Sequence, residues 1–183
     1  AGSNITVTDP WKVRSNGRGE DFHKASGVSL DMDWKLGDIL FRSLSSYSDN
    51  EGSQFWDLDN SDVVTIAQSD GVSIAYETFT QEFQLQSNNE GPTKWILGLF
   101  YYTENSSFDQ VLDWDNFFVA GGPKSILDAT IDVQADALGA FGQIEYSVSD
   151  NLEVVAGLRY NKDKKTAFAT LFIPDFGVVG PNG

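Results

Sequence analysis

The segment LGAFGQIEYSVSDNLEVVAGLRY, residues 138–160, determines the fold that this sequence predicts. On its second arm, apolar residues occupy every second position, and mostly polar residues or glycine stand between them. The first arm, residues 138–146, alternates in the same way, and the polar residues 147–151 separate the two arms. A period of two is typical of a β-strand whose faces meet different surroundings. We therefore expect a β-hairpin with one apolar face, which includes Leu152, Val154, Ala156, Leu158 and Tyr160.

Each arm of this hairpin has the length and the aromatic ends of a membrane-spanning strand. At ~3.3 Å per residue, residues 138–146 and 152–160 each cover roughly 26 Å. With a tilt of about 40°, this length approaches the ~25 Å apolar band of an outer-membrane barrel. Tyr146 and Tyr160 each end an apolar stripe, as the aromatic girdles at membrane interfaces do. The alternative interpretation is a hairpin of a soluble sandwich, with one face on a core.

Four further strands follow from the same period in the upstream sequence. We expect them at residues 28–35, 39–47, 77–87 and 94–104. The last of them has an apolar row with aromatic residues at both ends, formed by Trp95, Leu97, Leu99 and Tyr101. Together with the hairpin, these strands predict an all-β fold, an antiparallel up-and-down meander of about six strands.

The connections between the expected strands alternate in length. Short turns are expected near Gly37, Asn89 and Ser149, and long loops at residues 49–76 and 105–134. Outer-membrane barrels show this asymmetry, since their periplasmic turns are short and their extracellular loops are longer. The sequence thus predicts part of a large transmembrane β-barrel, incomplete and open, with long loops at one end. The aromatic residues expected at the periplasmic side are Trp34, Trp95 and Tyr146, and those at the outer side are Tyr47, Tyr101 and Tyr160.

The composition excludes several classes of function. The chain has 27 acidic and 12 basic residues and a formal charge of -15, whereas a nucleic-acid partner requires clustered Lys and Arg. There is no cysteine, which excludes disulfides and thiolate metal sites. The longest strongly apolar run, residues 95–102, is far shorter than the ~20 residues of a transmembrane helix. Only strands of this chain could therefore cross a bilayer.

Several short motifs resemble the barrel of the TonB-dependent receptors, a family of outer-membrane active transporters. One motif is FGQ at residues 141–143, followed by Tyr146, Ser149-Asp150 and AGLRY at residues 156–160. The others are SLSSY at residues 43–47, FTQEFQL at residues 79–85 and WILGLFY at residues 95–101. They occur in the order and with the spacing of the family, and together they cover about residues 26–165.

The resemblance implies a barrel of about 22 strands closed around a plug domain. Such a receptor binds a scarce small-molecule ligand, such as a siderophore, a vitamin or a saccharide, and imports it with energy that the TonB complex delivers through the plug. The implied location is the bacterial outer membrane, with outer-membrane lipid around the barrel. Six strands cannot close such a barrel. We therefore expect residues 1–183 to be an interior fragment of the barrel domain, without the plug and the remaining strands, and with residues 1–24 and 162–183 in loops.

Two groups of residues are expected to contact other molecules. Aromatic and acidic side chains near the expected loop tips are candidates for ligand contact, since exposed aromatics beside acids often bind ligands. These are Trp56, Asp57, Asp59, Trp114, Phe117 and Phe118, and the alternative role for them is packing of loop against loop. A polar wall is expected to face the lumen or the plug. It includes Glu82, Gln143, Glu145 and Arg159, together with Asp31, Asp33, Arg42, Gln84 and Glu153.

We expect no catalytic, metal or cofactor site. The acidic residues 57–62 begin like an EF-hand calcium loop, but Asp62 and Gln68 stand where that loop needs Gly and Glu. His23 is the one histidine of the chain; it is expected in a loop, and no nucleophile-bearing turn accompanies it. The sequence therefore predicts a transport protein that is not an enzyme.

Two other architectures fit parts of this pattern. A secreted carbohydrate-binding β-sandwich would place the loop-end aromatics at a sugar site and would pack its apolar faces together in two layers. A small passive outer-membrane barrel of about eight strands would show the same alternation, but it needs a closing strand.

Overall fold

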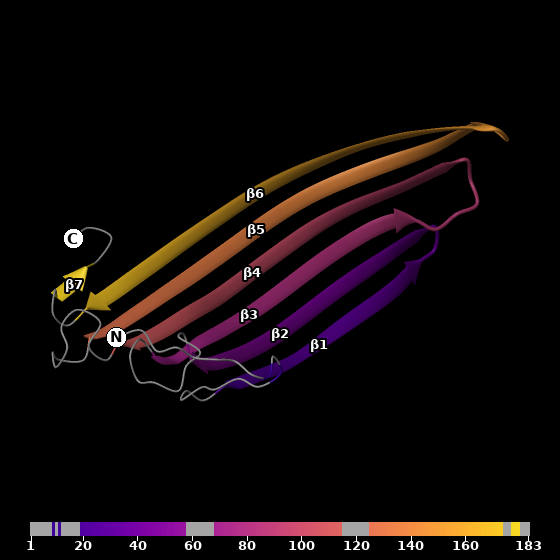
Figure 1. Ribbon diagram of the computed structural model, residues 1–183. Helices are drawn as coiled ribbons and strands as arrows, with labels where there is room; N and C mark the ends of the chain where they lie inside the picture. Colours follow the sequence, from indigo (N-terminus) through magenta and orange to yellow (C-terminus); the bar gives the residue numbers. More distant parts are fainter. Residues whose placement is uncertain are drawn as a thin grey trace.

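The computed structural model describes Asp9, Trp11 and residues 19–57, 68–114, 125–173 and 177–179. Within these ranges the strands are β1 (Glu20–Leu36), β2 (Ile39–Asp57), β3 (Gln68–Ser87), β4 (Thr93–Trp114), β5 (Ser125–Ser149), β6 (Leu152–Ile173) and β7 (Gly177–Val179). Each strand pairs antiparallel with the next, so the order in the sheet is the order in the sequence (Figure 1). The expected up-and-down meander is confirmed, and the three-residue β7 is an addition to it.

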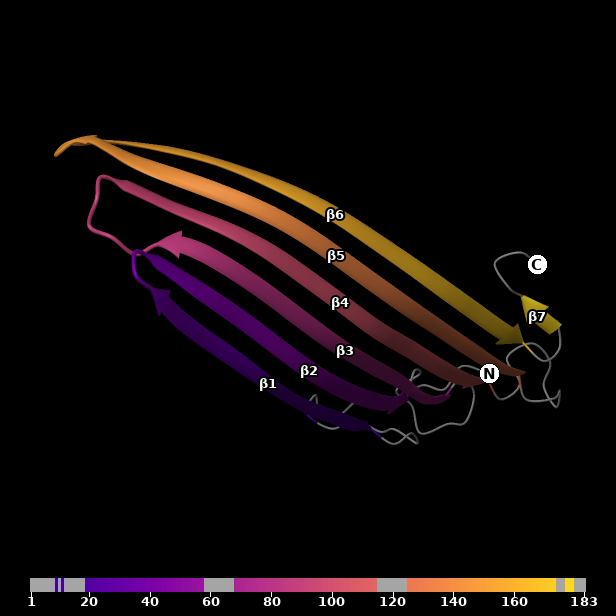
Figure 2. The ribbon, with the colours of Figure 1, turned by 180° about the vertical axis from the view of Figure 1, so that it is seen from behind.

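Figures 1 and 2 show these strands as one curved layer, with β1 at one edge and β6, next to the short β7, at the other. The sheet is not closed, and the described strands do not form the two layers of a sandwich. Within the described ranges, no helix is long and apolar enough to span a membrane. The architecture is therefore an open fragment of a barrel wall, as the alternation predicts.

The strands are much longer than the sequence predicts. The loops expected at residues 49–76 and 105–134 are strand, except for residues 58–67 and 115–124, which lie outside the described residues. The prediction of two long loops was therefore wrong in its boundaries. Alternation with a period of two continues through both segments, but the apolar side chains there belong to the opposite face of the sheet.

The first and last long strands, β1 and β6, also extend into segments that were predicted to be loops. β1 begins at Glu20 and β6 continues to Ile173, although residues 1–24 and 162–183 were expected in loops. His23, also expected in a loop, lies in β1, where its Nε2 is 3.0 Å from Asp21 Oδ1. Backbone pairing with β2 and β5 accounts for these extensions, since it satisfies the donors and acceptors of the added residues.

The register divides the side chains between two faces, which we name after neighbouring residues of β6. One row across the six long strands contains Trp34, Phe41, Leu85, Leu97, Gly142 and Leu158. The adjacent row, one residue away along every strand, contains Asp33, Arg42, Gln84, Gly98, Phe141 and Arg159. Because adjacent residues of a strand point to opposite faces, the Leu158 face is apolar and the Arg159 face is mostly polar near the tight turns.

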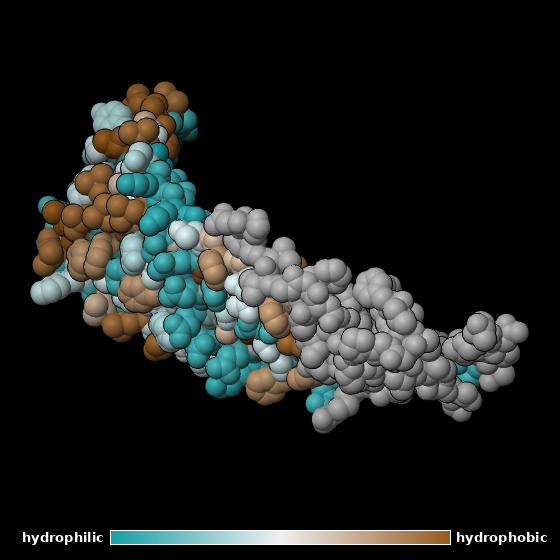
Figure 3. All heavy atoms as spheres, turned by 90° about the vertical axis from the view of Figure 1, so that its left-hand side faces the viewer, coloured by the Kyte–Doolittle hydropathy of each residue, from teal (hydrophilic) through white to brown (hydrophobic). Residues whose placement is uncertain are grey.

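The Leu158 face is open rather than packed. Leu97 is 54% exposed, Leu99 58% and Leu158 83%, whereas Val72 is the one hydrophobic side chain classed as buried among the described residues. Hydrophobic side chains gather along one border of the molecule in Figure 3, with a hydrophilic strip beside them. The sheet thus has no core of its own, and its apolar face requires apolar surroundings.

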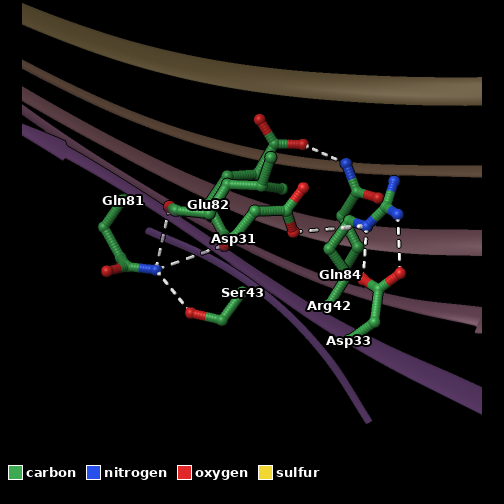
Figure 4. A network of polar contacts seen from close by, with 8 residues as sticks. Asp31, Asp33, Arg42, Ser43, Gln81, Glu82 and Gln84 are labelled. Atoms are coloured by element: carbon green, nitrogen blue, oxygen red, sulfur yellow. Dashed lines mark hydrogen bonds and ion pairs between the residues drawn. The ribbon is translucent and has the colours of Figure 1, made fainter. Parts of the chain in front are cut away.

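Three polar side chains, Ser43, Ser45 and Gln81, interrupt the Leu158 face, and Figure 4 shows the contact between Gln81 and Ser43. Gln81 Nε2 donates to Ser43 Oγ at 3.0 Å and to the Leu44 carbonyl at 3.1 Å, and Ser45 Oγ donates to Gln81 Oε1 at 2.6 Å. Ser43 is only 4% exposed. The Gln81 amide therefore finds its partners within the sheet, which an apolar environment requires of a polar group.

A glycine on the Arg159 face makes room for an aromatic ring. Phe141 is the register partner of Gly98, and its ring covers that glycine so closely that a Cβ there would overlap it. The guanidinium carbon of Arg159, on the other side of Phe141, lies 5.9 Å from the centroid of the same ring. Gly98 is thus required for the position of the ring that Arg159 contacts.

We expect Gln81→Leu to destabilise the assembled protein by about 1–3 kcal/mol, because the hydroxyls of Ser43 and Ser45 lose their partner in apolar surroundings. Adding Ser43→Ala and Ser45→Ala removes those hydroxyls and is expected to restore most of the loss. Urea unfolding of the full-length protein in detergent measures both variants. A triple variant as unstable as the single one would contradict this account.

We expect Gly98→Ala to destabilise the protein by about 1–3 kcal/mol, since the new methyl group must displace the Phe141 ring. Gly139→Ala is the matched control on the same face, because its Cβ would meet the end of the Asn161 side chain at 3.0 Å and its other neighbours at ordinary contact distances of 3.6 and 3.7 Å. The same urea titration is the measurement. Equal midpoints for the two variants would show that the ring has room to move.

Candidate functional site

Charged side chains gather on the Arg159 face where β1 and β2 approach their tight turn (Figure 4). Arg42 donates from Nε to Asp33 Oδ1 at 2.6 Å and from Nη2 to Asp33 Oδ2 at 2.7 Å, which is a bidentate pair. Asp31 Oδ1 lies 3.7 Å from the same Nε. One guanidinium thus holds two carboxylates of the neighbouring strand.

Glu82 of β3 extends this cluster to a third strand. It is aligned with Leu44 and Asp31 in one row, and its carboxylate accepts a hydrogen bond from Gln84 Nε2. Arg42 and Lys35, which lies on the same face and also acts on Asp33, are therefore two cations among three carboxylates, those of Asp31, Asp33 and Glu82. This part of the wall retains an excess of negative charge.

Two further residues of the predicted polar wall, Gln143 and Glu145, form a hydrogen-bonded pair on β5. Gln143 Nε2 donates to Glu145 Oε1 at 2.8 Å, close to the turn that joins β5 and β6. Arg159 of β6 donates from Nε to Asn161 Oδ1 at 2.8 Å and lies over the ring of Phe141. Among the described residues, no carboxylate lies within ion-pair distance of Arg159.

The structure thus places Glu82, Gln143, Glu145 and Arg159 on one face, as the alternation predicts. It does not bring them into one cluster, because they occupy three strands and each contacts a neighbour on its own strand. Their contact with a lumen or a plug stays a prediction.

The polarity of the two faces inverts in the half of the sheet that is distant from the tight turns. Here the Arg159 face is apolar on β3, β4 and β5, which form a surface that we call the distal wall. Its members are Val72, Ile74, Tyr76, Phe108, Leu112, Leu127, Ile131 and Val133. The register places them together, since Ile74, Phe108 and Ile131 occupy one row.

The Leu158 face of the same distal half is polar and acidic. A shallow hollow there is lined by carboxylates, amides and hydroxyls together with apolar groups. The lining includes Asp49, Glu51, Glu77, Asp132, Asn105, Gln134, Ser107, Thr166, Ala75 and Phe168. Water or hydrated headgroups suit this surface, in contrast to the apolar half of the same face.

The residues predicted at loop tips lie elsewhere or outside the described residues. Trp56 is half-buried near the end of β2, where it pairs with Ser69 on the Arg159 side of the sheet. Asp57 and Trp114 are the last residues of β2 and β4, so they are strand residues and the prediction of loop tips was wrong for them. Asp59, Phe117 and Phe118 lie outside the described residues.

The distal wall was not predicted from the sequence. Its signal is visible in the sequence, because Val72, Ile74 and Tyr76 alternate with Ser73 and Ala75, and residues 127–133 alternate in the same way. Both runs have the period of a strand. They fell within the segments interpreted as long loops, so their alternation was not used.

Comparison with known families agrees with this geometry. The family description "TonB dependent receptor-like, beta-barrel" matches residues 2–179, almost the whole chain. The chain belongs to this family. The expected membership of the TonB-dependent receptors and the expected barrel fold are thereby confirmed.

A solved member of the family has the same fold. The crystal structure of the ferric yersiniabactin uptake receptor FyuA from Yersinia pestis superimposes with a TM-score of 0.75 at 13% sequence identity, over 92% of this chain. The chain spans 24% of the length of that receptor. A search of curated proteins finds no match. The likeness to FyuA thus concerns the fold of about a quarter of a receptor.

The described residues contain no group of three or more His, Asp or Glu side chains placed to hold a metal ion. The acidic run at residues 57–62, which begins like a calcium loop, falls largely outside the described residues. The candidate site is therefore the Arg159 face itself, with a charged section near the turns and an uncharged distal wall.

We expect Arg42→Gln to lower the unfolding midpoint of the full-length protein, because the carboxylates of Asp31 and Asp33 then lose the guanidinium that lies close to both. Adding Glu82→Gln relieves part of the repulsion and is expected to recover part of the loss. Salt screens such charges, so the difference between wild type and Arg42→Gln is expected to shrink as sodium chloride rises from low to high concentration. A loss that does not depend on salt would contradict the electrostatic explanation.

Proposed function

We propose that this chain forms part of the wall of an outer-membrane receptor, which imports a scarce ligand with energy delivered by the TonB complex. The observation that supports this most directly is the opposite polarity of two adjacent rows on four of the six long strands, β1, β2, β3 and β6, of a single open layer. A barrel wall that separates lipid from a polar lumen needs this alternation. Membership of the TonB-dependent receptor family supports the same function.

The Leu158 face supplies the lipid contact in this proposal. Trp34 and Trp95 lie at its turn end, and Tyr47, Tyr101 and Tyr160 lie at the other end of its apolar section. Aromatic residues at two levels suit the two interfaces of a bilayer, which we propose to be the bacterial outer membrane. The network around Gln81 is compatible with lipid, since the amide is bonded within the sheet.

The Arg159 face supplies the lumen and the contact with a plug domain. The carboxylates around Arg42 exceed the cations there, and Arg159 has no described carboxylate partner. A plug with a basic group near Asp31 and Glu82, and an acidic group near Arg159, would complement this wall. The plug and the remaining strands of a closed barrel are part of this proposal.

The ligand of the proposed receptor is a siderophore, a vitamin or a saccharide. FyuA is described as an uptake receptor for ferric yersiniabactin, which supports an uptake role for a barrel of this fold. A small passive barrel is the second candidate, because it would present the same lipid-facing wall. Dependence on TonB distinguishes the two.

Expression of the full-length gene in a bacterium with a deletable tonB gene tests the proposal. Cells are offered radiolabelled ferric siderophores, cobalamin and oligosaccharides, and accumulation is measured with and without TonB. We expect accumulation of a ligand from one of these classes, and its loss without TonB. Accumulation that continues without TonB would favour the passive barrel.

Two adjacent valines of β6 test which face meets lipid. Val154 belongs to the Leu158 face and Val155 to the Arg159 face, and they are 52% and 53% exposed. We expect Val154→Lys to destabilise the assembled barrel by up to about 1 kcal/mol, since the register pairs Val154 with Tyr146 near the turn-side interface. Val155→Lys is the matched control and is expected to be nearly neutral. Unfolding in lipid vesicles is the measurement, and the reverse order would reject the proposed orientation.

A further inference from the structure

We infer that the distal wall binds a ligand that has an apolar or aromatic surface and no net negative charge. The position of this wall in the lumen rests on the proposed function, and the inference adds the chemical class of the ligand. In a receptor of the proposed orientation, the distal wall lies toward the outer side, because it is far from the tight turns.

The distal wall offers open apolar side chains on three neighbouring strands. Ile74 is 40% exposed, Tyr76 42% and Ile131 39%, and the partly buried Phe108 lies between the two isoleucines in the same row. Contiguous exposed apolar side chains on a folded protein mark a surface that another molecule covers. Trp56 of β2 adds an aromatic ring near the edge of this surface.

The distal wall has no charged side chain among the side chains of β3 to β6 that the structure describes. This holds from the row of Tyr76 outward as far as Val72, Leu112, Leu127 and Leu171. The positions are Val72, Ile74, Tyr76, Ser106, Phe108, Gln110, Leu112, Leu127, Ala129, Ile131, Val133, Ala167, Ala169 and Leu171. Their few hydrogen-bonding groups are amide and hydroxyl groups, which is the usual composition of a site for a small organic molecule.

The charges that border the wall disfavour an anion. The nearest row of the same face contains Glu104, which accepts a hydrogen bond from Tyr102, and Lys165 as the one nearby cation of β6. Asp163 lies one row further toward the turns. An anion on the distal wall would lose hydration without gaining a paired cation, and it would approach a chain of net charge -15. An uncharged or cationic ligand avoids both costs.

Two fluorescent probes with the same ring system test this inference on the full-length receptor in detergent. N-phenyl-1-naphthylamine is uncharged, and its 8-sulfonate is an anion of similar shape. We expect the uncharged probe to bind about tenfold more tightly than the sulfonate, since only the sulfonate must desolvate a charge. Equal affinities, or tighter binding of the sulfonate, would overturn the inference.

Substitutions at two adjacent residues of β3 locate the bound probe. Ile74→Asp places a carboxylate in the distal wall and is expected to weaken the uncharged probe about tenfold. Ser73→Asp introduces the same charge on the Leu158 face, where Ser73 is exposed, and is expected to change affinity by less than about twofold. Ile74→Lys supplies the missing cation, so it is expected to strengthen binding of the sulfonate.

The remaining outcomes reject the inference and separate it from the proposed function. If Ile74→Asp and Ser73→Asp behave alike, or if neither probe binds, then the distal wall is covered by another part of the receptor. TonB-dependent accumulation of ligand in cells is a separate readout. Accumulation without TonB combined with the expected probe results would reject only the proposed function, whereas TonB-dependent accumulation with equal probe affinities would reject only this inference.

Discussion

The continuous backbone register is the constraint on which the rest of this structure depends. Every long strand pairs with the next over almost its full length, so the face of a residue on one strand fixes the face of its partners on all six. The apolar residues of single strands form a continuous apolar surface only because the register places them on the same face of the sheet. A slip of one residue in β2 alone would move Arg42 to the Leu158 face and Phe41 to the polar face.

The inversion of polarity along the strands comes from the sequence and not from the register. β4 and β5 pair without a shift from Thr93 to Trp114, yet apolar residues occupy odd positions near Leu97 and even positions near Phe108. Bulges lie at Gln54/Trp56 and Ser69/Gly71 instead, beyond most of the inverted segment. In the proposed receptor, the same wall would thus separate lipid from a polar lumen in one half, and water from an apolar lumen in the other.

The sequence predicts the strands near the turns well, because their apolar stripe keeps one phase and ends on aromatic residues. The prediction fails where the apolar positions move from one face of the strand to the other, as at Ile74 and Tyr76. There the apolar residues no longer continue the earlier alternation, so the segment resembles an irregular loop. Contacts such as Gly98 with Phe141 cannot be predicted from one strand, because they depend on the register between β4 and β5. Parity alone placed Glu82, Gln143, Glu145 and Arg159 on one face, whereas their hydrogen-bond partners required coordinates.

The difference between the distal wall and the charged section near the turns gives a physical reason why uptake by the proposed receptor would need energy. A ligand on the distal wall is held mainly by burial of apolar surface, at roughly 25 cal/mol per Å². The surface toward the turns presents Glu82 and Arg42 beside Leu44, Phe100 and Phe141, so charged groups interrupt the apolar contact there. Movement of the ligand along the wall therefore exchanges apolar contact for hydrated charge, which is unfavourable without an outside source of work. In the proposed receptor, the TonB complex supplies that work, and the polar section keeps a captured ligand from moving inward before it arrives.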